Sequence, residues 1–139
     1  MNRPHHRGER GVMLLEALIG ILIFSIGILA LLGMQAVAMR ATIDAKYRSE
    51  ASFLANEIVG VMWGDPANLD DYADANCAAT PRCNTWATRV QTLLPGATGG
   101  NAPSIAVNNR VVQVTIRWQQ QGEPVSNHTV LAQIYRATD

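Results

Sequence analysis

The sequence predicts an α+β fold in which a long N-terminal helix packs on a small antiparallel β-sheet. Three observations lead to this class. An apolar run covers residues 12–34, apolar residues then recur at helical spacing as far as Val61, and apolar and polar residues alternate over residues 111–118. A chain of 139 residues leaves room for one small domain beside such a helix.

The apolar run is long enough to cross a membrane. Residues 12–34 would form a helix of roughly 35 Å, and the hydrocarbon core of a bilayer is about 30 Å thick. Glu16 is the one charged residue in this run, and an ionised acid within a bilayer costs on the order of 2.5–3.5 kcal/mol near the centre and less near an end. Glu16 is therefore a candidate functional residue. A basic head precedes the run and contains Arg3, His5, His6, Arg7 and Arg10.

Three simpler interpretations compete. A secretory signal peptide would use the small residues 36–38 as a cleavage site, but its apolar region is normally 7–15 residues long and uncharged. A plain single-pass anchor, oriented by the basic head on the cytoplasmic side, explains the length but not Glu16. A buried core helix would not need such a continuous apolar run.

The stretch from Arg10 to Ile19 resembles the leader junction of type IV pilins and secretion pseudopilins. In that family a basic leader ends in Gly, and the fifth residue after it is Glu. The resemblance implies that a dedicated inner-membrane peptidase removes residues 1–11 by cutting after Gly11, and that it methylates the new α-amine of Val12. It makes Glu16 the assembly contact. Three positions depart from the common pattern: Val12 replaces Phe, Met13 replaces Thr or Ser, and Gly33 replaces a Pro that kinks the helix.

The helix is expected to continue beyond the membrane to about Trp63, where Gly64-Asp65-Pro66 ends it. Its second half is amphipathic, so one stripe should pack on the rest of the protein. Two helices separated by a break over residues 39–42 are the alternative. The stripe consists of Ile43, Tyr47, Ala51, Leu54, Ile58 and Val61.

A loop is expected over residues 67–82. Cys77 and Cys83 are the only cysteines, and the implied topology places them in the oxidising periplasm, which favours a disulfide between them. An acidic cluster in the loop makes a calcium site conceivable, although its spacing matches no loop motif. The cluster consists of Asp70, Asp71 and Asp74.

The remainder of the chain predicts one short helix and three strands. The helix covers residues 84–94 and carries apolar residues at helical spacing, and Pro95-Gly96 ends it. The strands cover residues 105–107, about 111–118 and about 128–135, and Asn108-Asn109 is a plausible turn between the first two. The helix positions are Trp86, Val90, Leu93 and Leu94, and the buried strand positions are Val112, Val114, Ile116 and Trp118.

Composition limits the possible functions. The precursor has 11 basic and 11 acidic residues, and loss of three Arg and one Glu with the leader leaves a formal charge of −2, which is no signature of nucleic-acid binding. The histidines, serines and acids are scattered, and His128 alternates within a strand, so the sequence predicts neither an enzyme nor a cofactor or metal site.

Three stretches beyond residue 50 resemble the PilV-type minor pilins, also called type IV pilus modification proteins. They are Leu54-Ala55-Asn56-Glu57-Ile58, Trp86 with Leu93-Leu94-Pro95-Gly96, and the strand from Val112 to Trp118. A minor pseudopilin of type II secretion shares the N-terminal motif and stays an alternative. A membrane-tethered periplasmic binding module is the alternative from another class.

The resemblance implies a pilin-like fold with three parts: a leader of residues 1–11, a transmembrane and assembly helix of residues 12–35, and a periplasmic head of residues 36–139. It places the chain in the inner membrane with its N-terminus in the cytoplasm, and later in a surface pilus. The expected partners are other minor and major pilins, the prepilin peptidase and methyltransferase, the inner-membrane assembly machinery and the lipid bilayer.

Overall fold

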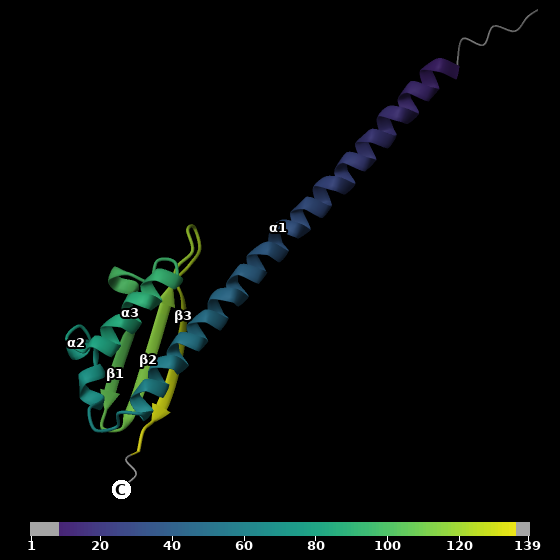
Figure 1. The fold of residues 1–139 in the computed structure, drawn as a ribbon. Coiled ribbons are helices and arrows are strands. Elements are labelled where there is room, and N and C mark those ends of the chain that lie inside the picture. The colour runs from purple at the N-terminus through teal and green to yellow at the C-terminus, as the bar shows by residue number, and fades with distance from the viewer. Residues whose placement is uncertain (1–8, 136–139) are drawn as a thin grey trace, which may run out of the picture. The chain divides into compact units, whose positions relative to one another are not determined.

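A computed structural model of the chain describes residues 9–135 and has the expected α+β fold (Figure 1). The chain divides into two compact units, residues 1–43 and 44–139, and the helix that begins the first unit continues into the second. The elements in order are α1 (Glu9–Trp63), the 3-10 helix η1 (Leu69–Tyr72), α2 (Asp74–Cys77), α3 (Pro81–Leu93), the 3-10 helix η2 (Gly99–Asn101), β1 (Ser104–Asn108), β2 (Val111–Trp118) and β3 (Ser126–Gln133).

Helix α1 is a single helix of 55 residues, so the alternative with a break over residues 39–42 is wrong. The helix ends at Trp63, as the Gly64-Asp65-Pro66 sequence predicts. The N–H of Gly64 closes the last turn by donating to the carbonyl oxygens of Gly60 at 3.3 Å and Val61 at 3.1 Å. The peptide N–H is lost at Pro66, which prevents further helical hydrogen bonding.

The second half of α1 buries a stripe that differs in part from the predicted one. Ile43 is 38% exposed and Val61 is only half-buried, whereas Met62, absent from the predicted stripe, is fully buried. The steps of three and four residues therefore continue to Met62, which keeps the buried residues on one face of a helix with 3.6 residues per turn. The buried residues are Ala51, Leu54, Ala55, Ile58, Val59 and Met62.

The three strands form one antiparallel sheet in the order β1-β2-β3. The predicted buried face of β2 is confirmed, because Val112, Val114, Ile116 and Trp118 are all at most 1% exposed. The turn prediction is wrong by one residue: Asn108 pairs with Val111 within the sheet, so the turn is Asn109-Arg110. Asn109 has a φ of 55°, a conformation that Asn adopts more readily than most residues. Strand β3 begins at Ser126 and ends at Gln133, two residues earlier at each end than predicted.

The segment predicted as a loop contains η1 and α2, and α3 begins at Pro81 instead of residue 84. Proline suits the first turn of a helix because its missing N–H would have no partner there. Helix α3 ends at Leu93, one residue earlier than predicted; Leu93 is 41% exposed, while Leu94 just beyond the helix is buried. Gly96 follows with a φ of +64°, and a Cβ there would lie 2.8 Å from the carbonyl oxygen of Gln119, so this turn requires glycine.

The core of residues 44–135 lies between the second half of α1, α3 and the buried face of the sheet. The indole N–H of Trp86 in α3 donates to the carbonyl oxygen of Leu54 in α1 at 2.8 Å. Ile105 of β1 and Ile134, one residue beyond β3, complete the core. This arrangement confirms that the sheet packs on the amphipathic half of the long helix.

Candidate functional site

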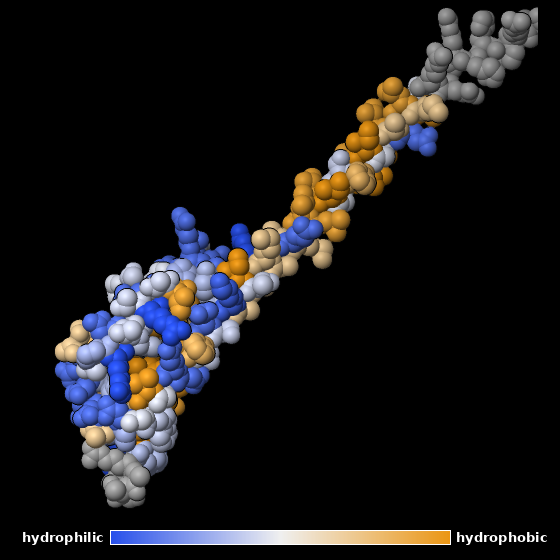
Figure 2. Space-filling view, in the orientation of Figure 1, coloured by the Kyte–Doolittle hydropathy of each residue, from blue (hydrophilic) through white to orange (hydrophobic). Residues whose placement is uncertain are grey.

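The first half of α1 is an apolar surface with one carboxylate on it. Every residue from 11 to 43 is exposed, including large side chains such as Phe24, which is 69% exposed. Figure 2 shows mostly hydrophobic residues, in orange, along the first half of the helix. The helix is long and apolar enough to cross a membrane. Glu16 lies in its first turns, together with Gly11 and Val12, so the structure brings these three sequence-predicted residues onto one short helical segment.

The side chains of residues 11–135 supply no group that neutralises Glu16. Residues three and four positions away on a helix are its neighbours on the surface, and here they are Val12, Met13, Ile19 and Gly20. None of these side chains can donate a hydrogen bond. Among the side chains of residues 11–135, none pairs with the Glu16 carboxylate. A carboxylate in this setting needs a partner from outside these residues if it enters an apolar environment ionised.

The other polar side chain of the run is satisfied within the helix. The hydroxyl of Ser25 donates to the carbonyl oxygen of Ile21 at 2.7 Å. Such a bond lets a hydroxyl enter an apolar environment at little cost. Both residues lie on the same exposed part of α1, but only Glu16 needs a hydrogen-bond or charge partner from another molecule when this part enters an apolar environment.

The bond between Gly11 and Val12 lies within helix α1, which begins at Glu9. Nothing lies within 4 Å of the position where Gly11 would carry a Cβ, so the space around it is open. Glycine costs a helix about 1 kcal/mol relative to alanine, and this lowers the cost of unwinding the first turns. The rest of the predicted leader, residues 1–8, lies outside the described residues.

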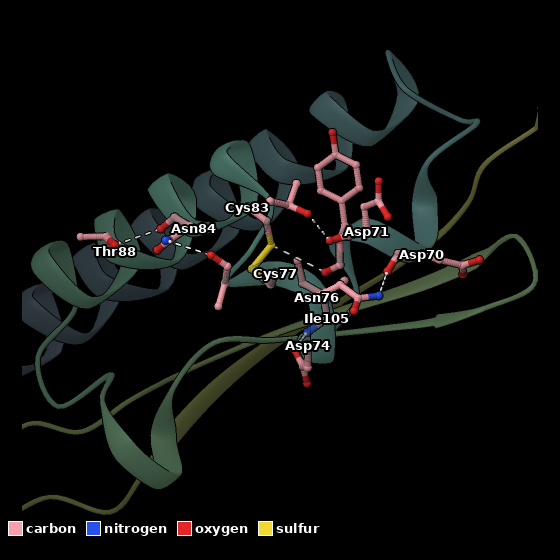
Figure 3. The surroundings of a disulfide bond; sticks show 12 residues. Asp70, Asp71, Asp74, Asn76, Cys77, Cys83, Asn84, Thr88 and Ile105 are labelled. Carbon is pink, nitrogen blue, oxygen red and sulfur yellow. Dashed lines mark hydrogen bonds between the residues drawn. A yellow bond between two sulfur atoms is a disulfide. The ribbon is translucent and has the colours of Figure 1, made fainter.

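The second candidate region surrounds the disulfide (Figure 3). Cys77 and Cys83 are bonded, as predicted, and join the end of α2 to the buried face of α3. Two side-chain hydrogen bonds link residues within the same segment. The side-chain amide of Asn76 donates to the carbonyl oxygen of Asp70 at 2.9 Å, and the hydroxyl of Thr80 donates to the carbonyl oxygen of Asp71 at 2.8 Å. The disulfide and these bonds hold the turns between α1 and α3 in place.

We expect removal of the disulfide to lower the stability of this unit moderately. The ring spans six residues of sequence separation, which gives about 2 kcal/mol on the chain-entropy scale. The double variant Cys77→Ala/Cys83→Ala should therefore unfold at lower denaturant concentration than the wild type. The measurement is urea unfolding of the full chain in detergent micelles. Reduction of the wild-type chain is the matched control and should give the same loss. An unchanged unfolding midpoint in the double variant would contradict a stabilising role.

The three acidic residues of this region do not gather into a metal site. Figure 3 shows the carboxylates of Asp70, Asp71 and Asp74 pointing in different directions. One oxygen of Asp74 already accepts a hydrogen bond from the backbone N–H of Ile105 in β1. Within the described part of the chain, no group of three or more His, Cys, Asp or Glu side chains is placed to hold a metal ion.

Tyr72 and Asp65 form a further polar contact that the sequence did not predict. The hydroxyl of Tyr72 donates to a carboxylate oxygen of Asp65 at 3.2 Å. Burial raises the pKa of Tyr72 above its ordinary value. The hydroxyl therefore stays protonated and can donate at neutral pH. The contact ties η1 to the turn after α1.

An ion pair links α3 to the second half of α1. The guanidinium of Arg89 lies 2.7 Å from one carboxylate oxygen of Glu57 and also lies over the ring of Phe53 at 6.0 Å. The other carboxylate oxygen of Glu57 is buried and has no hydrogen-bond partner within the described residues. Helical spacing could not predict this pair, because Glu57 and Arg89 are 32 residues apart in the sequence.

No protein-family model matches this chain, and neither a curated protein nor a solved structure is found to match it.

Proposed function

We propose that this chain is a minor structural subunit of a type IV pilus. In this proposal it enters the inner membrane as a prepilin, is cleaved after Gly11 and methylated at Val12, and joins other minor and major pilins through its N-terminal helix. It acts with them in priming the fibre, and so contributes to adhesion and twitching motility. Its head, the second half of α1 with the sheet, lies in the periplasm before assembly.

The observation that carries the proposal is the carboxylate of Glu16, which pairs with no side chain of residues 11–135 and lies on the exposed, otherwise apolar first half of α1. Cleavage after Gly11 would bring this carboxylate from the eighth to the fifth position of the helix. It would then lie close to the partial positive charge of the new helix N-terminus. The α-amine of Val12 on a neighbouring subunit would supply a full positive charge.

The same pair would also set how the helices align. Apolar side chains from Leu14 to Met34 give contact area in a helix bundle but little preference for one axial position. A shift by one helical turn would leave both charges unpaired among apolar groups, which is costly. The Glu16–Val12 pair thus supplies the register and the apolar run supplies the contact.

Two other functions share part of this support. A minor pseudopilin of a type II secretion system would use the same N-terminal features, and the secretion of an exoprotein distinguishes it from a pilin. A membrane-tethered binding module would need the apolar helix but not Glu16. The open groove between α1 and α3, whose lining includes Glu50, Asn84 and Arg89, is where such a module would bind its ligand.

The mature N-terminus tests the proposal directly. We expect intact-protein mass spectrometry to show a chain that begins at Val12 and carries one methyl group. Gly11→Phe should leave the full-length precursor in the inner membrane, because a bulky side chain would occupy the open space at the bond to be cut.

Gly27→Phe is the matched control for processing. Gly27 also lies in the exposed apolar helix with nothing within 4 Å of its Cβ position, but it is far from the bond after Gly11. The Gly27→Phe precursor should therefore be cleaved after Gly11 like the wild type. A mature chain that begins at Met39 would instead identify a secretory signal peptide and overturn the proposal.

A further inference from the structure

The register of the sheet defines which backbone groups of β3 face away from it. Asn108 and Val111 flank the two-residue turn, so they exchange hydrogen bonds, and bonding then alternates along each strand. Even-numbered residues of β2 therefore bond to even-numbered residues of β3. The N–H of Ile134 donates to the carbonyl oxygen of Arg110 at 2.8 Å, which continues this pattern. The residues whose N–H and C=O groups point outward are Asn127, Thr129, Leu131 and Gln133.

The opposite edge of the sheet is closed. On β1 the alternation directs the N–H of Ile105 outward, and the carboxylate of Asp74 accepts its hydrogen bond. Helices η1 and α2 lie against the same strand. Proteins commonly protect an edge strand by covering it in this way. The sheet therefore cannot be extended on the β1 side.

The β3 edge lacks this protection. The strand is eight residues long and contains neither a proline nor a Lys, Arg, Asp or Glu. Its four outward-facing residues are all exposed, and Leu131 is 67% exposed. No group within residues 9–135 takes a hydrogen bond from, or gives one to, the outward backbone atoms of β3. Figure 1 shows β3 at the border of the sheet.

We infer that the outer edge of β3 binds an extended segment of another protein, which adds to the sheet as a fourth strand. The free N–H and C=O groups define the partner's chemistry: they bond to a backbone in β conformation and not to a particular side chain. The partner is uncharged along the paired residues, because β3 offers no charge to match one. An apolar side chain opposite Thr129 would cover Leu131. This inference does not depend on the pilus function.

A second copy of the chain could use this edge in one arrangement only. Because β1 is closed, two copies could pair only through β3 with β3, which gives a two-fold symmetric antiparallel arrangement. A segment of another protein is not restricted in this way, because an extended strand can add to the edge in either direction. The edge therefore suits a segment of a different protein, and a dimer of the chain is one outcome of the test.

The test uses the full chain in detergent micelles and a fluorescent, end-blocked peptide with the sequence of residues 125–134 as the probe. We consider the peptide antiparallel to β3, with Val130 of the peptide opposite Val130 of the protein. Asn127 of each strand then pairs with Gln133 of the other, and Thr129 of each pairs with Leu131 of the other, so every outward N–H and C=O group of β3 has a hydrogen-bond partner. We expect saturable binding by fluorescence anisotropy. N-methylation of Thr129 and Leu131 in the peptide should weaken it at least about tenfold, since two hydrogen-bond donors are lost.

A peptide methylated at His128 and Val130 is the matched control and should bind like the parent, because those N–H groups point away from the protein in this pairing.

In the protein, Leu131→Pro removes one outward N–H and Leu131→Lys adds an edge charge, and each should weaken binding about tenfold. Gln113→Lys places the same charge opposite Leu131 on the central strand and should leave binding unchanged. Equal loss with both methylated peptides, or equal binding to all protein variants, would overturn the inference. So would a wild-type dimer that Leu131→Pro dissociates, because the occupant would then be a second copy.

Discussion

We expect Glu16→Ala to abolish most incorporation of this chain into pili while leaving membrane insertion and cleavage intact. The substitution makes the run from Val12 to Met34 wholly uncharged, so insertion should not suffer. It removes the carboxylate that would pair with the α-amine of Val12 on the next subunit, and that amine would then be buried without a partner. Loss of one member of a buried pair typically costs 3–5 kcal/mol. The measurement is immunoblotting of sheared pili against membrane fractions.

Three further variants sharpen this prediction. Ser25→Ala is the matched control, because the Ser25 hydroxyl bonds to Ile21 within its own helix and should not matter for assembly. Glu16→Gln keeps the size of the side chain but loses the charge, and should assemble as poorly as Glu16→Ala. Glu16→Asp keeps the charge on a shorter side chain and should be intermediate or poor. Wild-type amounts of Glu16→Ala in sheared fibres would show that Glu16 is not the assembly contact and would favour a membrane tether.

Periodicity predicted the elements whose signal is long and local. The helix to Trp63 followed from an unbroken apolar and then amphipathic pattern that ends at Gly64 and Pro66. The buried face of β2 followed from strict alternation of Val112, Val114, Ile116 and Trp118. The Cys77–Cys83 bond was predictable because these are the only two cysteines. Each of these features was determined by a local sequence pattern, and contacts with residues distant in the sequence did not change the structure that the pattern predicted.

Features that depend on distant residues could not be predicted in the same way. Val61 and Met62 both fit the helical spacing within about one residue, and only packing in the core selects Met62. The short helices η1 and α2 lack a strong periodic pattern, and contacts such as Asp74 with Ile105 hold them in place. The same contact decides which edge of the sheet stays open. In the first half of α1, the sequence identifies Glu16 as a candidate functional residue but does not identify the group that pairs with its carboxylate.

The second large effect is expected at Trp86, which joins α3 to α1. Its side chain is 5% exposed, and its indole N–H donates to the carbonyl oxygen of Leu54 at 2.8 Å. Trp86→Ala should lower the free energy of unfolding by about 3–5 kcal/mol, because it leaves a large cavity between the two helices. That is a large share of the 5–15 kcal/mol typical of a whole domain. The measurement is urea unfolding of the full chain in detergent micelles, followed by amide exchange at Val112 and Val114.

Comparison with the other two tryptophans separates packing from hydrogen bonding. Trp63 lies on the same helix as Leu54 but is 49% exposed, so Trp63→Ala should change the stability by less than about 0.5 kcal/mol. Trp118 is as buried as Trp86, but its indole N–H has no hydrogen-bond partner within residues 9–135. Trp86→Phe should therefore cost about 1 kcal/mol more than Trp118→Phe, because only the first loses a hydrogen bond. If the two Phe variants were equally stable, the bond to Leu54 would contribute nothing, and if Trp86→Ala unfolded like the wild type, α3 would not be held to α1 by this side chain.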